Sequence, residues 1–160
     1  MSDAAVIDPN VAQRRAADPS ASVWVSASAG SGKTKVLTDR VLALLLSGTE
    51  AHRILCLTFT KAAAAEMANR ISRELAIWTV AEPQDLTDRL SRLLGTVPNR
   101  ALNRTARRLF AEVLDTPGGL KIQTIQSFCE SLLARFPVDS GFTPLTQVMD
   151  ERCAAELMRT

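Results

Sequence analysis

A glycine-rich stretch carries the residue types best suited to chemistry. It reads Ala27-Ser-Ala-Gly-Ser-Gly-Lys-Thr34 and lies between a β-rich segment and a leucine-rich helical pattern. Glycines let the backbone turn tightly, so that successive N–H groups and the start of the next helix can face phosphate oxygens. Lys33 would neutralise the β- and γ-phosphates, and the Thr34 hydroxyl would ligate Mg²⁺. The stretch predicts a nucleotide site made of Ala27, Ser28, Ala29, Gly30, Ser31, Gly32, Lys33 and Thr34, with Lys33 and Thr34 as the catalytic candidates.

One position departs from the general pattern Gly-x4-Gly-Lys-Ser/Thr, because Ala27 stands where the first glycine would be. The alternative interpretation is a glycine-rich turn that binds nothing. The strand–turn–helix context favours nucleotide binding over that alternative.

Two successive strand–helix units are expected to position this stretch. The first combines a buried strand over residues 22–27 with a helix over 33–47, which Gly48 would end. The second combines a strand over 53–59 with a helix from Lys61 to Trp78, for which Thr60 is a plausible N-cap. Consecutive βα units indicate a parallel sheet with right-handed crossovers.

A helical insertion is expected at about residues 79–118. Its patterns predict helices over 85–94 and 99–114. Positive charge collects in this insertion. The arginines could form a solvated helix face or contact a DNA backbone, and the sequence favours neither interpretation. A third strand over 120–125, a helix over 127–136 and the start of another at 151–158 follow. The basic residues are Arg89, Arg92, Arg100, Arg104, Arg107 and Arg108.

Composition indicates one compact domain. The chain has 160 residues, 46% of them hydrophobic, and a net charge of +2, which argues against a disordered or strongly charged tail. Cys56, Cys129 and Cys153 form no closely spaced pair, and we expect buried thiols of a reducing compartment. The chain opens with no secretory signal and contains no apolar run of about 20 residues. These features predict a soluble, cytoplasmic protein.

The alanine-led phosphate stretch resembles motif I of the superfamily 1, UvrD/Rep-like DNA helicases. Gln13, 20 residues before Lys33, matches the family's Q motif, in which a glutamine amide binds adenine. Residues 57–67 resemble motif Ia, and residues 122–129 followed by 132–137 resemble motif Ib. The resemblance implies ATP binding that includes Gln13, and contacts with single-stranded DNA from Thr58, Phe59, Thr60, Lys61, Thr124 and Gln126.

Within this family, two stretches are most similar to AddA, the helicase–nuclease subunits of AddAB repair complexes. They are Thr58-Phe-Thr-Lys-Ala-Ala-Ala-Ala-Glu-Met67 and the Arg135-Phe-Pro137 ending. Gln126 stands where a histidine is usual. The resemblance implies an α/β P-loop NTPase (RecA-like) parallel sheet, of which residues 1–160 are a partial lobe 1A with the remaining helicase and nuclease parts absent. It further implies ATP with Mg²⁺, translocation along single-stranded DNA, unwinding of duplex DNA in double-strand-break repair, and an AddB-like partner.

Several alternatives stay open. Asp150-Glu151 is the only Asp-Glu pair, and we reject it as the Mg²⁺-binding Walker B element because no apolar strand leads into it. Gln13 alone could be a surface residue, whereas Met67, Trp24 and Trp78 are expected in the core. The rival functions are a UvrD-like helicase without a nuclease, a small P-loop kinase, and a non-catalytic nucleotide-binding module. DNA-stimulated ATP turnover would favour a helicase.

Overall fold

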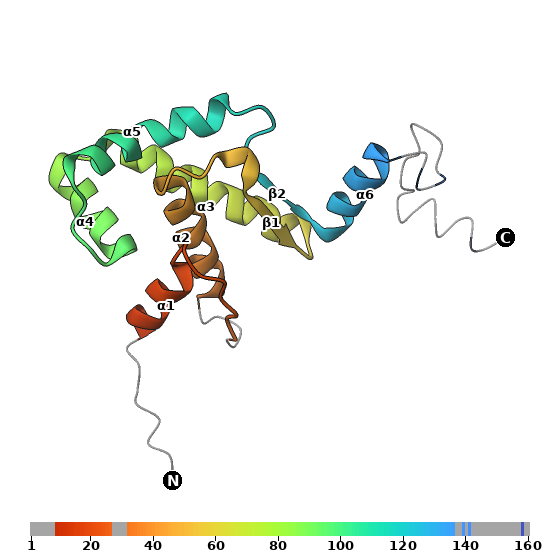
Figure 1. The fold of residues 1–160 in the computed structure, drawn as a ribbon, viewed down its shortest axis with the longest axis horizontal. Coiled ribbons are helices and arrows are strands. Elements are labelled where there is room, and N and C mark those ends of the chain that lie inside the picture. The colour runs from red at the N-terminus through yellow and green to blue at the C-terminus, as the bar shows by residue number, and fades with distance from the viewer. Residues whose placement is uncertain (1–8, 27–31, 137–138, 140, 142–157, 159–160) are drawn as a thin grey trace, which may run out of the picture.

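The computed structural model describes residues 9–26, 32–136, 139, 141 and 158. Figure 1 shows helices α1 to α5 gathered on one side of a short sheet and α6 extending from the other side. In chain order the elements are α1 (Pro9–Ala17), α2 (Lys33–Leu46), the 3-10 helix η1 (Ala51–Arg53), β1 (Leu55–Thr58), α3 (Lys61–Val80), α4 (Pro83–Leu94), α5 (Arg100–Asp115), β2 (Lys121–Thr124) and α6 (Ile125–Arg135).

The core of the described region lies among helices. Apolar side chains from α2, α3, α4 and α5 form one buried cluster, and α5 packs along α3. Trp78 is only 2% exposed and Met67 is also buried, which confirms the expectation for both residues. The members of the cluster include Leu42, Leu45, Ile71, Leu75, Trp78, Leu86, Leu90 and Leu109.

β1 and β2 form a parallel pair, as the succession of strand–helix units predicted. Their register sets Leu55 opposite Lys121 and Thr58 opposite Thr124. The alternating side chains of β1 divide between two environments: Cys56 packs against the helical core, whereas Leu55 and Leu57 are exposed. Because the strands are parallel, both chain segments leave the sheet at the same edge, where α3 and α6 begin.

The expected buried strand over residues 22–27 is not found. Residues 22–26 adopt no regular secondary structure, and Ala27 lies outside the described residues. Trp24 is 92% exposed, so its expected place in the core was wrong. Among the described residues, β1 and β2 pair with each other, and residues 22–26 pair with neither strand. The helix predicted over 151–158 falls almost wholly on residues outside the described part, as do Asp150 and Glu151.

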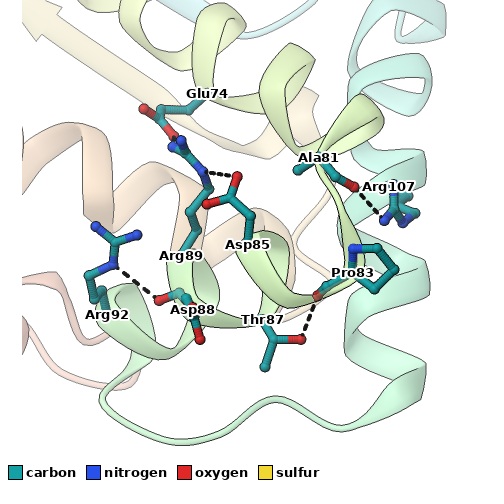
Figure 2. Close-up of polar contacts among 9 residues, drawn as sticks. All are labelled: Glu74, Ala81, Pro83, Asp85, Thr87, Asp88, Arg89, Arg92 and Arg107. Carbon is teal, nitrogen blue, oxygen red and sulfur yellow. Dashed lines mark hydrogen bonds and ion pairs between the residues drawn. The ribbon is translucent and has the colours of Figure 1, made fainter.

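The segment between α3 and β2 is helical, as expected. Asn99 caps α5 by accepting a hydrogen bond from the Leu102 N–H at 2.8 Å, and Gly95 ends α4 at a φ of 73° that favours glycine. Arg107 fastens α5 to the α3–α4 connection by donating to the Thr79 carbonyl at 3.0 Å and the Ala81 carbonyl at 2.7 Å. Figure 2 shows the Ala81 contact.

The two described cysteines differ in their surroundings. Both are free thiols, but Cys56 is half-buried whereas Cys129 is exposed, so the expectation of a buried thiol fails for Cys129. Helix α6 has no buried residue, which explains the exposure of its cysteine. Cys153 lies outside the described residues.

This difference predicts selective alkylation. Burial raises the pKa of the Cys56 thiol, so less of it is the reactive thiolate at neutral pH. In a Cys153→Ser chain at about pH 7.5, we expect iodoacetamide to modify Cys129 roughly tenfold faster than Cys56. Peptide mass spectrometry over time measures both rates. Faster modification of Cys56 would contradict the placement of its side chain against the core.

Candidate nucleotide and DNA sites

Gly32 forms the start of helix α2. Its φ of 86° and ψ of 17° lie in the left-handed region, which favours glycine because other residues have a Cβ atom. No side chain caps this helix, and the Val36 N–H donates to the Gly32 carbonyl at 3.1 Å. The backbone N–H groups in the first turn of a helix find no acceptor within the helix itself. This end of α2 therefore has the geometry and the dipole for a phosphate.

Gln13 lies directly against this helix start. A Cβ atom placed on Gly32 would be 3.5 Å from the Gln13 side-chain nitrogen, Nε2. The structure thus brings Gln13 and Gly32 together, and α1 packs along α2 to hold them so. Helix α1 was not expected from the sequence, although Pro9 at its first position is a recognised helix-start signal. Five residues of the predicted phosphate stretch, 27–31, lie outside the described residues.

Arg40 of α2 fixes the chain that follows α1. Its guanidinium donates to the carbonyls of Ala16 at 3.2 Å, Asp18 at 2.6 Å and Ala21 at 2.6 Å. No sequence pattern indicated this role, because the acceptors are backbone atoms 19 to 24 residues away. Arg40 thereby joins the helix that carries Gln13 to the helix that carries Lys33.

A local turn supports the same connection. The Asp18 carboxylate accepts hydrogen bonds from the side chain of Ser20 at 2.7 Å and from its backbone N–H at 2.9 Å. These two bonds, in that order, lower the pKa of Asp18. The turn keeps the Asp18 carbonyl where Arg40 reaches it.

The predicted DNA-contacting residues lie at one edge of the sheet. Thr58 and Thr124 are register partners at the ends of β1 and β2, so the two stretches that resemble motifs Ia and Ib lie side by side. Phe59 is 89% exposed, and Lys61 and Gln126 are exposed as well. This edge therefore combines an aromatic side chain, a cation and an amide that solvent can reach.

Two threonines of this edge act as helix caps. The Thr60 hydroxyl oxygen accepts from the Ala63 N–H at 3.1 Å, which confirms the N-cap expected there. The buried Thr124 hydroxyl oxygen accepts from the Ser127 N–H at 3.1 Å and caps α6. The Thr58 hydroxyl donates to the Thr60 carbonyl at 2.8 Å. These hydroxyls order the turns that present Phe59 and Gln126.

The six arginines of the helical segment do not act as one group. Arg89 is paired with Asp85 at 3.0 Å, Arg108 with Glu112 at 3.3 Å, and Arg107 with backbone carbonyls. Arg100 and Arg104 are exposed on α5. Arg92 lines a groove among helices α1, α2, α3 and α4.

Two further features of the described residues bear on function. Among them, no group of three or more His, Cys, Asp and Glu side chains could hold a metal ion. None of the helices described is both long and apolar enough to cross a membrane.

The described residues form a mixed α/β protein with a parallel strand pair, in which Gly32 starts the helix that carries Lys33 and Thr34. The chain belongs to the UvrD/Rep helicase family, because the model for the UvrD/REP helicase N-terminal domain matches residues 9–160. This membership bears out the resemblance and the fold class that the motifs indicated.

Curated relatives are named as subunits of an ATP-dependent helicase/nuclease, of the AddA type. The chain is 35% identical to the one from Lactobacillus gasseri over 142 residues, which cover 89% of this chain and 10% of that protein. It is 37% identical to the one from Lactobacillus johnsonii over 137 residues, covering 86% and 10%. For Desulforamulus reducens the identity is 37% over 141 residues, covering 84% and 9%. The chain thus spans about a tenth of the length of these relatives.

Proposed function

We propose that this chain is the N-terminal ATP-binding part of an ATP-dependent DNA helicase, or translocase, that acts in double-strand-break repair and recombination. The contact between Gln13 and Gly32 carries this proposal, because it sets a base-reading amide beside the helix start that can hold phosphates. The names of the similar proteins, which are ATP-dependent helicase/nuclease subunits, support the choice of a helicase.

In this proposal Lys33 binds the β- and γ-phosphates, and backbone N–H groups at the start of α2 bind phosphate oxygens. Thr34, partly exposed in the first turn of α2, would hold Mg²⁺, which would neutralise phosphate charge during hydrolysis. The residues of 27–31 would complete the loop, and Gln13 would bind adenine.

The DNA strand would cross the edge formed by the ends of β1 and β2. Phe59 offers a ring on which a base can stack, and Lys61 offers a charge for a backbone phosphate. Gln126, in place of the usual histidine, would donate from its amide. Thr58, Thr60 and Thr124 would act by ordering the N–H groups of this edge. We further propose an AddB-like partner, since the similar proteins are named as subunits.

DNA-stimulated ATP turnover tests this function. Phosphate release from ATP is measured for the full-length protein that carries this chain, with and without a single-stranded oligonucleotide. A helicase motor gives turnover that rises several-fold with DNA. Turnover that is indifferent to DNA would favour a kinase or another NTPase, and no turnover at all would favour a non-catalytic module.

The Arg40 connection gives a prediction about base selection. Arg40→Ala removes three hydrogen bonds that hold α1 and its following turn, so Gln13 should lose its fixed place beside Gly32. We expect the KM for ATP to rise roughly tenfold and the preference for ATP over GTP to fall, with a smaller change in kcat.

Arg100→Ala, which removes an exposed arginine from α5, is the matched control. Equal losses for ATP and GTP in the Arg40 variant would show that Arg40 serves folding and does not position Gln13.

A further inference from the structure

A basic groove lies among helices α1, α2, α3 and α4. Its volume is about 800 Å³, within the range of sites that take small molecules. Leu42, Leu93 and the buried Trp78 contribute apolar surface to it. Six cationic side chains line it, from four helices: Arg14, Lys35, Arg70, Arg73, Arg89 and Arg92.

Carboxylates already neutralise half of these cations. Lys35 is paired with Asp39 at 2.6 Å, Arg70 is paired with Glu66, and Arg89 lies between Asp85 at 3.0 Å and Glu74 at 3.6 Å. Figure 2 shows Arg89 between its two acidic partners. The hydrogen bond with Asp85 raises the pKa of Arg89. The two acidic residues that line the groove, Asp39 and Glu74, are both in these pairs.

The other three cations differ from these. Within the described part of the chain, Arg14, Arg73 and Arg92 have no carboxylate within ion-pair distance, and all three are exposed. Arg92 donates through Nε to the Asp88 carbonyl at 3.2 Å, as Figure 2 shows. Arg14 reaches across from α1 to the end of α4, where a Cβ on Gly95 would be 3.3 Å from its Cδ. Three guanidinium groups from α1, α3 and α4 therefore line one concave surface.

Trp78 contributes its ring to the wall of the groove. Its indole Nε1 atom is fully buried and has no acceptor among the described residues. A molecule in the groove would therefore meet the ring of Trp78 and not its N–H group.

The groove adjoins the site proposed for adenine, but the phosphate-binding residues do not line it. A small cavity of about 40 Å³ that is lined by Gln13 shares Arg14, Lys35, Asp39, Arg92 and Leu93 with the groove. Gly32, Lys33 and Thr34 are not among the residues that line the groove. Arg73 is twelve residues along α3 from Lys61, which is about 18 Å along the helix axis. The groove therefore lies beside Gln13 and away from the DNA-facing edge of the sheet.

We propose that this groove is a second anion site that binds a small polyphosphate, either a free phosphate chain or the phosphates of a nucleotide. Guanidinium groups bind phosphate oxygens through paired hydrogen bonds, and three of them offset most of the negative charge of such a chain. The four surrounding helices favour a compact ligand over a continuous DNA strand, which needs an open track. Lys33 does not line the groove, so the proposal can be tested in a variant that lacks this lysine.

Calorimetry allows a direct test in the full-length protein that carries this chain. The Lys33→Ala change removes the phosphate-loop cation. Inorganic tripolyphosphate is titrated into this variant, and calorimetry measures the affinity. We expect saturable binding of the anion.

Charge-matched variants locate the anion. Arg73→Ala with Arg92→Ala should weaken binding at least about tenfold, whereas Arg100→Ala with Arg104→Ala on α5 should change it less than about twofold. Circular dichroism compares folding, and Arg92→Gln alone provides a milder variant that should weaken binding in the same direction. Equal effects of the two pairs, or a response lost with Lys33→Ala alone, would overturn the proposal.

Two further titrations identify the ligand. If ATP and tripolyphosphate compete at the Lys33→Ala chain, the site accepts nucleotide phosphates, and if only tripolyphosphate binds, it takes a free phosphate chain. A single-stranded oligonucleotide is titrated in the same way. If it binds more tightly than ATP and tripolyphosphate, and if its binding depends on Arg92, the ligand of the groove is a DNA strand and the proposal is overturned.

Discussion

Lys33→Ala is expected to lower ATP turnover by about two to three orders of magnitude, because a positioned charge in a phosphate-transfer site contributes that much. The ammonium group belongs to the first residue of α2, directly after Gly32, where the helix dipole and the first-turn N–H groups already favour phosphate. Removing it leaves the negative charge of the triphosphate without its side-chain counterion. Binding of a fluorescent ATP analogue should weaken as well.

Lys121→Ala is the matched control for this variant. Lys121 is exposed at the start of β2, at the opposite end of the strand from Thr124, and lies outside both proposed sites. Its loss removes the same charge from the chain and should leave turnover within about twofold of the original, since exposed charges interact weakly. Wild-type turnover in the Lys33 variant would contradict the assignment of the phosphate site.

The local elements could be predicted where sequence pattern alone decides them. The apolar residues that recur every third or fourth position from Met67 to Trp78 predicted α3, and the Thr60 cap set its start. Gly95 marked the end of α4, because a left-handed residue there favours glycine. These features depend on residues within a few positions of one another.

Features that depend on distant partners were not predictable in this way. The pattern of residues 22–26 suits a strand, but a strand also needs a neighbour to pair with, and no local feature supplies one. Arg40 binds carbonyls around the end of α1, and Arg14, Arg73 and Arg92 meet in one groove only through helix packing. The phosphate stretch and Gln13 were found from their spacing, whereas their contact at Gly32 required the fold.

The DNA-facing edge gives the second large expected effect. Phe59→Ala with Lys61→Ala should lower DNA stimulation of ATP turnover about ten- to a hundredfold, while basal turnover without DNA changes little. Phe59 is 89% exposed, so its removal deletes almost no core contact, and a base stacked on a ring is worth about 1–3 kcal/mol. Thr60 stays in place, so the cap of α3 and the turn that presents this edge are kept.

Leu114→Ala with Lys121→Ala is the control, because both residues are exposed and lie away from this edge. Measuring ATP turnover against oligonucleotide concentration separates a weaker DNA affinity from a lower maximal stimulation. Loss of a stacking and charge contact should raise the DNA concentration needed for half-maximal stimulation and reduce its salt dependence, since one phosphate contact fewer releases fewer counterions. An equal fall of basal and stimulated turnover would instead show that Phe59 and Lys61 serve folding or ATP binding, because the loss of a DNA contact lowers only the turnover measured with DNA.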